Sequence, residues 1–220
     1  MNFVTHIDVG DREKVGSYLR VLQRIGKVKG YKPPTEDWFD DGISFCLDGN
    51  SNAIQFMIYD LEGLLREQME MSDSKRKQLK SIAKKVGGLL RVEVRLTKPK
   101  AIRRYTDEVT TSEQVADMCK RRERTFGDVF RQIIPSGDFH KKDRAAEIMR
   151  KKVTDRAMRR RMLRLIELIP EKKSLLLAQK ALNYRGIDDV MEMFEKIEVS
   201  PVTISKRHDI KKLDNLYKYL

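Results

Sequence analysis

Three short segments in which apolar and polar residues alternate constrain the fold of this chain most strongly. They span residues 4–9, 55–60 and 90–96. Alternation of this kind is typical of β-strands, because successive side chains point to opposite faces of a sheet. In the third segment the apolar residues share one face, and Arg91, Glu93 and Arg95 share the other. If the three strands are neighbours, one face of the sheet gathers carboxylates, a phenol and guanidinium groups.

The remaining pattern predicts an α+β chain. One further strand is expected at 43–47, and a hairpin turn at 48–52 joins it to a strand at 53–59 that overlaps the second segment. Helical spacing of apolar residues predicts helices at 12–25, 61–86 (interrupted at 72–74), 112–124, 141–169, 174–183 and 187–197.

The strand signal disappears after Pro99. We therefore predict an antiparallel sheet with flanking helices, followed by an all-helical C-terminal region. The expected domains are an α+β domain over 1–100 and a helical, basic, DNA-binding domain over 101–220.

The charge of the chain points to a polyanionic partner. The sequence has 46 basic and 33 acidic residues, a formal net charge of +13 and a pI near 9.7. Such a bias favours nucleic acid. The segment Lys141–Arg164, expected to be one helix, carries eleven basic residues and three acidic ones. A solvated charged helix is the alternative interpretation. The predicted phosphate contacts of this segment are Arg150, Lys151, Arg156, Arg159 and Arg160.

Other classes of protein find little support in the sequence. Cys46 and Cys119 match neither a disulfide framework nor a zinc-site spacing. No window approaches the roughly 20 apolar residues that a membrane span requires. We expect a cytoplasmic protein that acts on neither a membrane nor a small-molecule substrate.

The polar face of the predicted sheet offers a specific chemistry. A tyrosine opposite a divalent ion held by carboxylates can cleave one DNA strand and stay linked to the phosphate. On this hypothesis Tyr59 is the nucleophile, and Asp8 and Glu93 hold Mg²⁺ or Mn²⁺. Arg91 and Arg95 clamp phosphate oxygens. The alternative is a solvated sheet face in which Glu93 pairs with an arginine.

Several motifs in order resemble the rolling-circle replication initiators of filamentous phages and of related phages and plasmids of Gram-positive bacteria. These motifs are His6-Ile7-Asp8-Val9-Gly10-Asp11, Gln55 to Tyr59-Asp60, Leu90 to Leu96 with Lys98-Pro99-Lys100, and a tail from Ile197 to Tyr217. The resemblance implies a replication-initiator or relaxase-like fold. It also implies a metal-dependent, site-specific nickase with Tyr59 as nucleophile and Asp8 and Glu93 as metal ligands.

The implied partners are origin DNA, single-stranded or supercoiled, and a host helicase or polymerase in a bacterial cytoplasm. The chain departs from the family at Leu61, where relatives carry a lysine, and it lacks residues that precede the His6 strand in the family. An N-terminally truncated or decayed copy is therefore expected. Two alternatives stay open: a non-catalytic DNA-binding regulator, and an RNA-binding or ribosome-associated basic protein.

Overall fold

The computed structural model describes residues 1–34, 44–71, 76–182 and 186–220. The chain forms two compact units. Unit 1 comprises residues 1–19 and 30–133, and unit 2 comprises residues 20–29 and 134–220. This division differs from the expected boundary at residue 100, because the helices that follow the sheet belong to unit 1 as far as residue 133.

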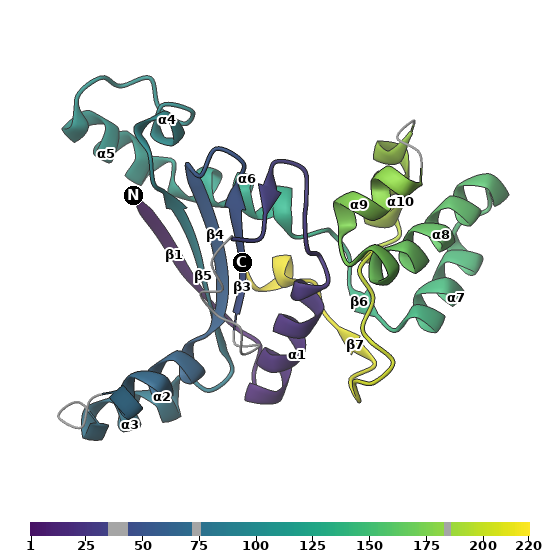
Figure 1. The fold of residues 1–220 in the computed structure, drawn as a ribbon, viewed down its shortest axis with the longest axis horizontal. Coiled ribbons are helices and arrows are strands. Elements are labelled where there is room, and N and C mark those ends of the chain that lie inside the picture. Colours follow the sequence, from purple (N-terminus) through teal and green to yellow (C-terminus); the bar gives the residue numbers. More distant parts are fainter. Residues whose placement is uncertain (35–43, 72–75, 183–185) are drawn as a thin grey trace. The chain divides into compact units, whose positions relative to one another are not determined.

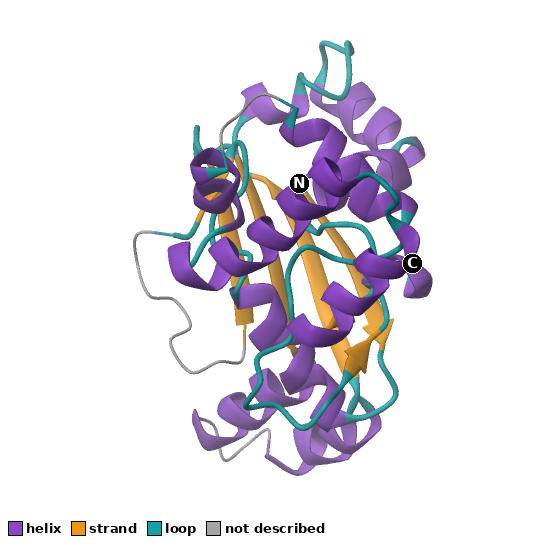
Figure 2. Cartoon of the chain, turned by 90° about the vertical axis from the view of Figure 1, so that its right-hand side faces the viewer, coloured by secondary structure: helices purple, strands orange, loops and turns teal. Residues whose placement is uncertain are grey.

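A five-stranded antiparallel sheet is the framework of unit 1 (Figure 1). Its strands lie side by side in Figure 2, in the order β1-β5-β4-β3-β2. They are β1 (Asn2–Asp8), β2 (Tyr31–Lys32), β3 (Ser44–Gly49), β4 (Ile54–Asp60) and β5 (Leu89–Leu96). The three segments with alternating residues are thus neighbours, with β5 between β1 and β4. The predicted hairpin joins β3 to β4, whereas β2 was not predicted.

The alternation along each strand separates an apolar face from a polar face. Phe56, Ile58, Val92 and Val94 are fully buried on the apolar face. The ring of Phe56 meets Phe130 edge to face, with 5.9 Å between the ring centroids. Because Phe130 lies on α6, this contact shows that α6 packs on the apolar face and leaves the other face for the polar side chains.

Six helices begin in the described part of unit 1. They are α1 (Arg12–Gln23), α2 (Leu61–Met71), α3 (Arg76–Lys85), α4 (Pro99–Ile102), α5 (Thr111–Lys120) and α6 (Arg122–Ile133). A capping box between Thr110 and Glu113 starts α5. The predicted helix at 112–124 is wrong in extent, since the chain turns at Arg121 and stays helical to Ile133. The predicted interruption at 72–74 lies outside the described residues.

Unit 2 is mainly helical, with one short ladder. Its elements are α7 (Lys142–Lys152), α8 (Arg156–Lys172), α9 (Leu175–Ala181), α10 (Ile187–Lys196), β6 (Phe139–His140), β7 (Lys212–Leu213) and a 3₁₀ turn at Leu216–Tyr219. β6 and β7 pair in antiparallel fashion, so the expectation of an all-helical region is wrong in this detail. The α+β class with an antiparallel sheet and a largely helical C-terminal part is confirmed. No helix in the ranges described is long and apolar enough to cross a membrane.

The single basic helix predicted over 141–169 is wrong, because the chain forms two helices here. Val153 is buried in an extended conformation, with φ −104° and ψ 106°. The side chain of Asp155 then accepts hydrogen bonds from the backbone N–H groups of Ala157 and Met158, which caps the start of α8. The basic residues are therefore divided between the end of α7 and the beginning of α8.

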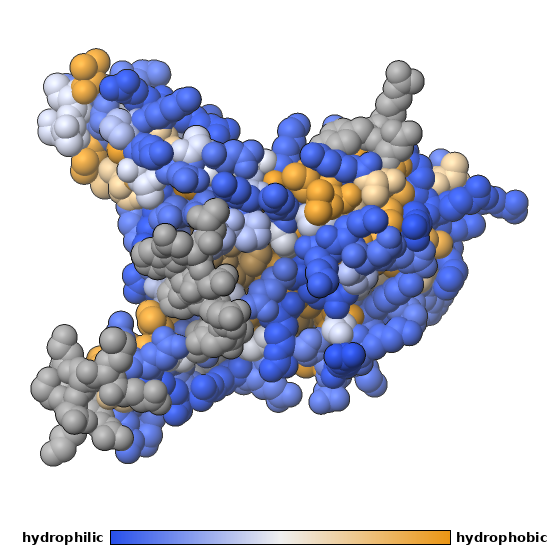
Figure 3. All heavy atoms as spheres, viewed as in Figure 1, coloured by the Kyte–Doolittle hydropathy of each residue, from blue (hydrophilic) through white to orange (hydrophobic). Residues whose placement is uncertain are grey.

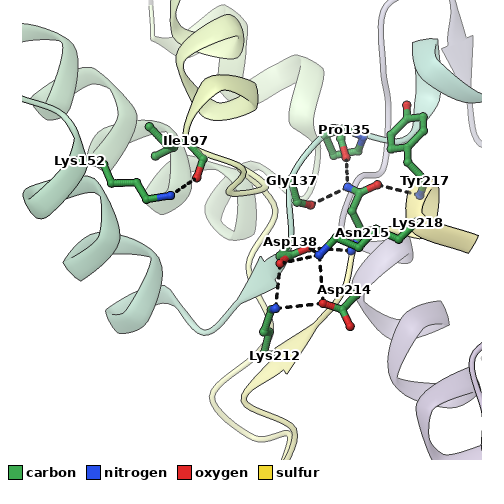
Figure 4. A network of polar contacts seen from close by, with 10 residues as sticks. All are labelled: Pro135, Gly137, Asp138, Lys152, Ile197, Lys212, Asp214, Asn215, Tyr217 and Lys218. Carbon is green, nitrogen blue, oxygen red and sulfur yellow. Dashed lines mark hydrogen bonds and ion pairs between the residues drawn. The ribbon is translucent and has the colours of Figure 1, made fainter.

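A polar network joins the C-terminal tail of the chain to residues 135–138 of unit 2 (Figure 4). The carboxylate of Asp138 pairs with Lys212 at 2.9 Å and Lys218 at 2.8 Å, and it accepts a hydrogen bond from the Asn215 N–H. The side-chain amide of Asn215 donates to the carbonyls of Pro135 and Gly137, at 3.0 and 2.6 Å. Desolvation raises the pKa of Asp138, but the lysines and the Asn215 N–H outweigh it and lower that pKa to about 2.

Removing the Asn215 amide should loosen this connection. In Asn215→Ala the buried carbonyl of Pro135 and the half-buried carbonyl of Gly137 lose their donor, at a cost of about 1–3 kcal/mol for a buried unsatisfied group. We expect faster amide hydrogen exchange in peptides covering 134–140 and 212–219, measured by mass spectrometry. Lys211→Ala, an exposed change in the same tail, is the control. Equal protection in wild type and Asn215→Ala would contradict the role given to this amide.

Candidate functional site

The carboxylate of Glu93 is the centre of the polar face of the sheet. Glu93 is only 1% exposed, yet both of its oxygens have partners. Oε1 accepts hydrogen bonds from the Tyr59 hydroxyl at 2.6 Å and from Arg91 Nε at 2.7 Å. Oε2 accepts from Arg95 Nε at 2.9 Å and from Asn2 Nδ2 at 3.0 Å. Four donors from three neighbouring strands thus meet at one buried charge.

Strand parity explains this convergence. β5 places Arg91, Glu93 and Arg95 at every second position, so all three project from the same face. The antiparallel register pairs Tyr59 with Arg91 and Asn2 with Arg95. The two arginines are thus the next residues on the same face of β5. Tyr59 and Asn2 lie opposite them on the neighbouring strands, so all four donors can reach the Glu93 carboxylate.

The network keeps the carboxyl group of Glu93 ionised and the hydroxyl group of Tyr59 protonated. Burial raises the pKa of Glu93, but hydrogen bonds from Tyr59, Asn2 and Arg95 outweigh it and lower that pKa to about 2. Burial and the hydrogen bond to Glu93 raise the pKa of Tyr59 well above its usual range. The side chains thus form an ionised carboxylate and a neutral phenol that donates to it. A phenol with a raised pKa is a poor nucleophile at neutral pH.

Asp8 does not join this cluster. Register pairs Asp8 with Leu89, four residues from Glu93 along β5. At roughly 3.3 Å per residue, the two positions are about 13 Å apart along the strands. Asp8 Oδ1 accepts a hydrogen bond from the Gly10 N–H at 2.8 Å, within the loop that follows β1.

The residues expected to hold a divalent ion do not fit one in this arrangement. A bound ion needs ligand oxygens within about 2.0–2.6 Å. The two carboxylates are too far apart for this, and both Glu93 oxygens already accept hydrogen bonds. Within the described ranges no group of three His, Cys, Asp or Glu residues could hold a metal ion.

The two arginines beside Glu93 keep part of their surface accessible. The side chain of Arg91 is 32% exposed and that of Arg95 is 42% exposed. Arg91 also lies over the Tyr59 ring, with its guanidinium carbon 6.0 Å from the ring centroid. Figure 1 shows α2–α3 and α4–α5 at opposite ends of the strands, and Figure 3 shows the surface hollowed between them. A polyanion could contact the accessible part of these guanidinium groups.

A second group of basic residues lies in unit 2, where α7 ends and α8 begins. We call residues 150–160 the basic corner; it holds six basic side chains and one acidic one. Arg150, Arg156 and Arg160 are exposed and form no ion pair with any residue that the structure describes. Lys151 pairs with Glu147 at 2.8 Å, and Arg159 donates to the carbonyl of Val153 at 3.0 Å. Three of the five predicted phosphate contacts of this segment are thus available to a ligand.

The dipole of α8 does not stabilise the charge of Arg156. Arg156 is the first residue of α8, where the helix dipole disfavours positive charge. By contrast, other basic side chains on α7 and α8 are paired: Lys142 with Glu167, Arg144 with Glu147, and Arg164 with Glu167. The basic corner therefore concentrates charge that the fold itself does not use.

Sequence reasoning missed several polar residues that the fold depends on. Asn2 supplies one of the four donors to Glu93, and this contact can be recognised only once the pairing of β1 with β5 is known. Asp138 and Asn215 join the tail to β6. The side chain and backbone N–H of Asn215 thus hold the C-terminal tail against residues 135–138.

Comparison with protein-family models, with curated proteins and with solved structures returned no match. The resemblance to rolling-circle initiators thus stays a prediction from the motifs.

Replacing Glu93 should destabilise unit 1 and change its response to acid. In Glu93→Gln two partly exposed arginines lose their counter-ion, which costs less than the roughly 3–5 kcal/mol of a fully buried pair because water reaches both guanidinium groups. The folded pKa is depressed, so the ion pair contributes its full stability above about pH 4.5 and loses it as the pH falls toward about 2. Urea unfolding followed by circular dichroism between pH 2.5 and 6 measures both effects.

Tyr59→Phe is the matched control, since it keeps the charge of Glu93 and removes one donor. It should cost less than Glu93→Gln and keep the steep loss of stability in acid. The assignment is wrong if wild type and Glu93→Gln show the same stability and the same pH dependence.

Proposed function

We propose that this chain is a DNA-binding protein that contacts the phosphate backbone and does not cleave it. The observation that carries this proposal is the basic corner, where three exposed arginines have no ion-pair partner among the described residues. Lys and Arg side chains that neutralise phosphates release counter-ions, which gives affinity that is salt-dependent and largely independent of sequence.

The charge of the whole chain supports the same function. A net charge of +13 raises the local concentration of a polyanion and speeds its association. The exposed edges of Arg91 and Arg95 add a further basic surface, in unit 1. The acidic face of α10, with Asp188, Asp189 and Glu192 exposed, would repel phosphate, so α10 is not the element that enters a groove.

The state of Tyr59 favours binding without cleavage. Its hydroxyl is a donor to a buried carboxylate, and its pKa is raised. The resemblance to replication initiators is the reason to name DNA as the ligand. On this proposal the chain is a regulator or a shortened initiator relative in the bacterial cytoplasm, where a host helicase or polymerase could act on the same DNA.

Neutralising the basic corner should weaken DNA binding and reduce its dependence on salt. We expect the triple variant Arg150→Gln, Arg156→Gln and Arg160→Gln to lower the slope of log affinity against log salt by up to about 3, at roughly 0.9 per lost phosphate contact. Fluorescence anisotropy with a labelled duplex at several salt concentrations measures the slope.

A second triple variant provides the control. Lys142→Gln, Arg144→Gln and Arg164→Gln remove the same charge from the same helices, but at side chains that already have carboxylate partners. This control should change the slope much less. Equal losses in both triples would show that only total charge matters, and a preference for RNA in direct competition would favour the RNA-binding alternative.

Nicking through Tyr59 is the second candidate, and its support is the proximity of the Tyr59 hydroxyl to the Glu93 carboxylate, 2.6 Å away. That contact brings the expected nucleophile to one of the two expected carboxylates. If a partner or bound DNA displaced the arginines, the carboxylate could accept the phenol proton.

Covalent capture separates the two candidates. Because the phenol is held neutral and the acids do not converge, we expect no protein–DNA adduct when the chain is incubated with single-stranded or supercoiled DNA and Mg²⁺ or Mn²⁺. Denaturing gels with labelled DNA detect such adducts. An adduct formed by wild type and lost in Tyr59→Phe would establish the nickase and overturn the non-catalytic proposal.

A further inference from the structure

A pocket in unit 1 is lined by residues that belong neither to the Glu93 network nor to the basic corner. It is formed by the loop after α4 and by residues along α6 from its start to Gln132, and its volume is about 210 Å³. Three arginines line it, Arg104, Arg121 and Arg124, together with the hydroxyl-bearing residues Tyr105 and Thr125. The volume is below the roughly 300–1,000 Å³ of pockets that enclose whole small molecules, so the pocket fits a small group.

Two hydroxyl groups at this pocket have no hydrogen-bond partner in the part of the chain that the structure describes. The Oγ1 atom of Thr125 and the hydroxyl of Tyr105 are both buried and unpartnered. Thr125 is only 1% exposed as a residue. A buried hydroxyl without a partner costs free energy, and most such groups in folded proteins are satisfied. Burial also raises the pKa of Tyr105, so its hydroxyl keeps the proton it can donate.

The charges around the pocket leave a cation available. Asp128, which also lines it, pairs with Arg131 at 3.1 Å, and Arg121 pairs with Asp117 at 3.0 Å. Arg104 forms no ion pair with any described residue, and its guanidinium carbon lies 5.9 Å from the centre of the Tyr105 ring. A guanidinium group held by an aromatic ring keeps its donors free for an anion.

We propose that this pocket binds a phosphate group, with Arg104 supplying the charge and the hydroxyls of Thr125 and Tyr105 donating to phosphate oxygens. Arg124, whose nearest carboxylate is 4.0 Å away at Asp128, is a second cation that can turn toward the ligand. The phosphate has two possible sources: a free anion or mononucleotide, and the terminal phosphate of a nucleic acid strand. The proposal is independent of the basic corner, which lies in unit 2.

Phosphate fits these residues better than an uncharged nucleobase. A base would stack on an exposed aromatic face, but the Tyr105 ring already lies against Arg104. Although Arg121 is paired and the carboxylates of Asp107 and Asp128 also line the pocket, Arg104 and Arg124 can offer paired N–H donors to an oxyanion. The hydroxyl groups of Thr125 and Tyr105 add neutral hydrogen-bond donors for the phosphate oxygens.

Isothermal titration calorimetry of the full chain tests the site. The probes are inorganic phosphate, a nucleoside 5′-monophosphate and its parent nucleoside, and a short oligonucleotide with and without a 5′-phosphate. We expect phosphate and the monophosphate to bind and the nucleoside to fail. Tighter binding of the phosphorylated oligonucleotide than of the unphosphorylated one would identify a strand end as the source, and equal binding would identify a free phosphate.

Three variants make the test specific. Arg104→Gln and Thr125→Val should each weaken phosphate binding about tenfold or more, since each removes a donor to a charged group. Thr125→Val keeps the shape of the side chain and removes an unpartnered hydroxyl, so it should fold at least as stably as wild type. Arg122→Gln, an exposed change on α6 outside the pocket, is the control and should bind phosphate like wild type.

The proposal is wrong if wild type binds neither phosphate nor the monophosphate, or if the nucleoside binds as tightly as its monophosphate. It is also wrong if Arg122→Gln weakens binding as much as Arg104→Gln. Loss of duplex binding in the basic-corner triple variant, with phosphate binding unchanged, would show that the two sites fail separately.

Discussion

The buried charge of Glu93 is the constraint on which the polar face of the sheet depends. A carboxylate that is 1% exposed is tolerated only when its lost hydration is replaced by donors and opposite charge. Tyr59, Arg91, Arg95 and Asn2 provide that replacement. Their positions are fixed by the pairing of β1, β5 and β4, so the strand register and the ion-pair network support each other.

This constraint also limits the chemistry of the face. A carboxylate that already has four donors has little capacity left for a metal, and a phenol that donates to it is held neutral. The same residues that suggest a nickase therefore form a stabilising network. The charge that the fold does not use lies elsewhere, in the basic corner and around Arg104, and these are the surfaces to which we assign binding.

The sequence predicts which side chains share the polar face of the sheet, but not how the neighbouring strands align with one another. Period-two alternation suffices to place Tyr59 and Glu93 on the same side of the sheet. The separation of Asp8 from Glu93 depends on how β1 aligns with β5, about 90 residues along the chain, and no local pattern specifies that alignment. The break between α7 and α8 has a local signal that helical periodicity overlooks, the cap at Asp155. The pocket around Arg104 has no periodic signal, because it arises where a loop packs on α6.

The side-chain carboxyl resonance of Glu93, followed by NMR through a pH titration and then with added Mn²⁺, tests the central claim most directly. Our account holds that Glu93 titrates near pH 2 and that Mn²⁺ does not selectively broaden its resonance. Titration near 4.5, or selective broadening of Glu93 together with Asp8 and Tyr59, would contradict it and would restore a metal site on this face.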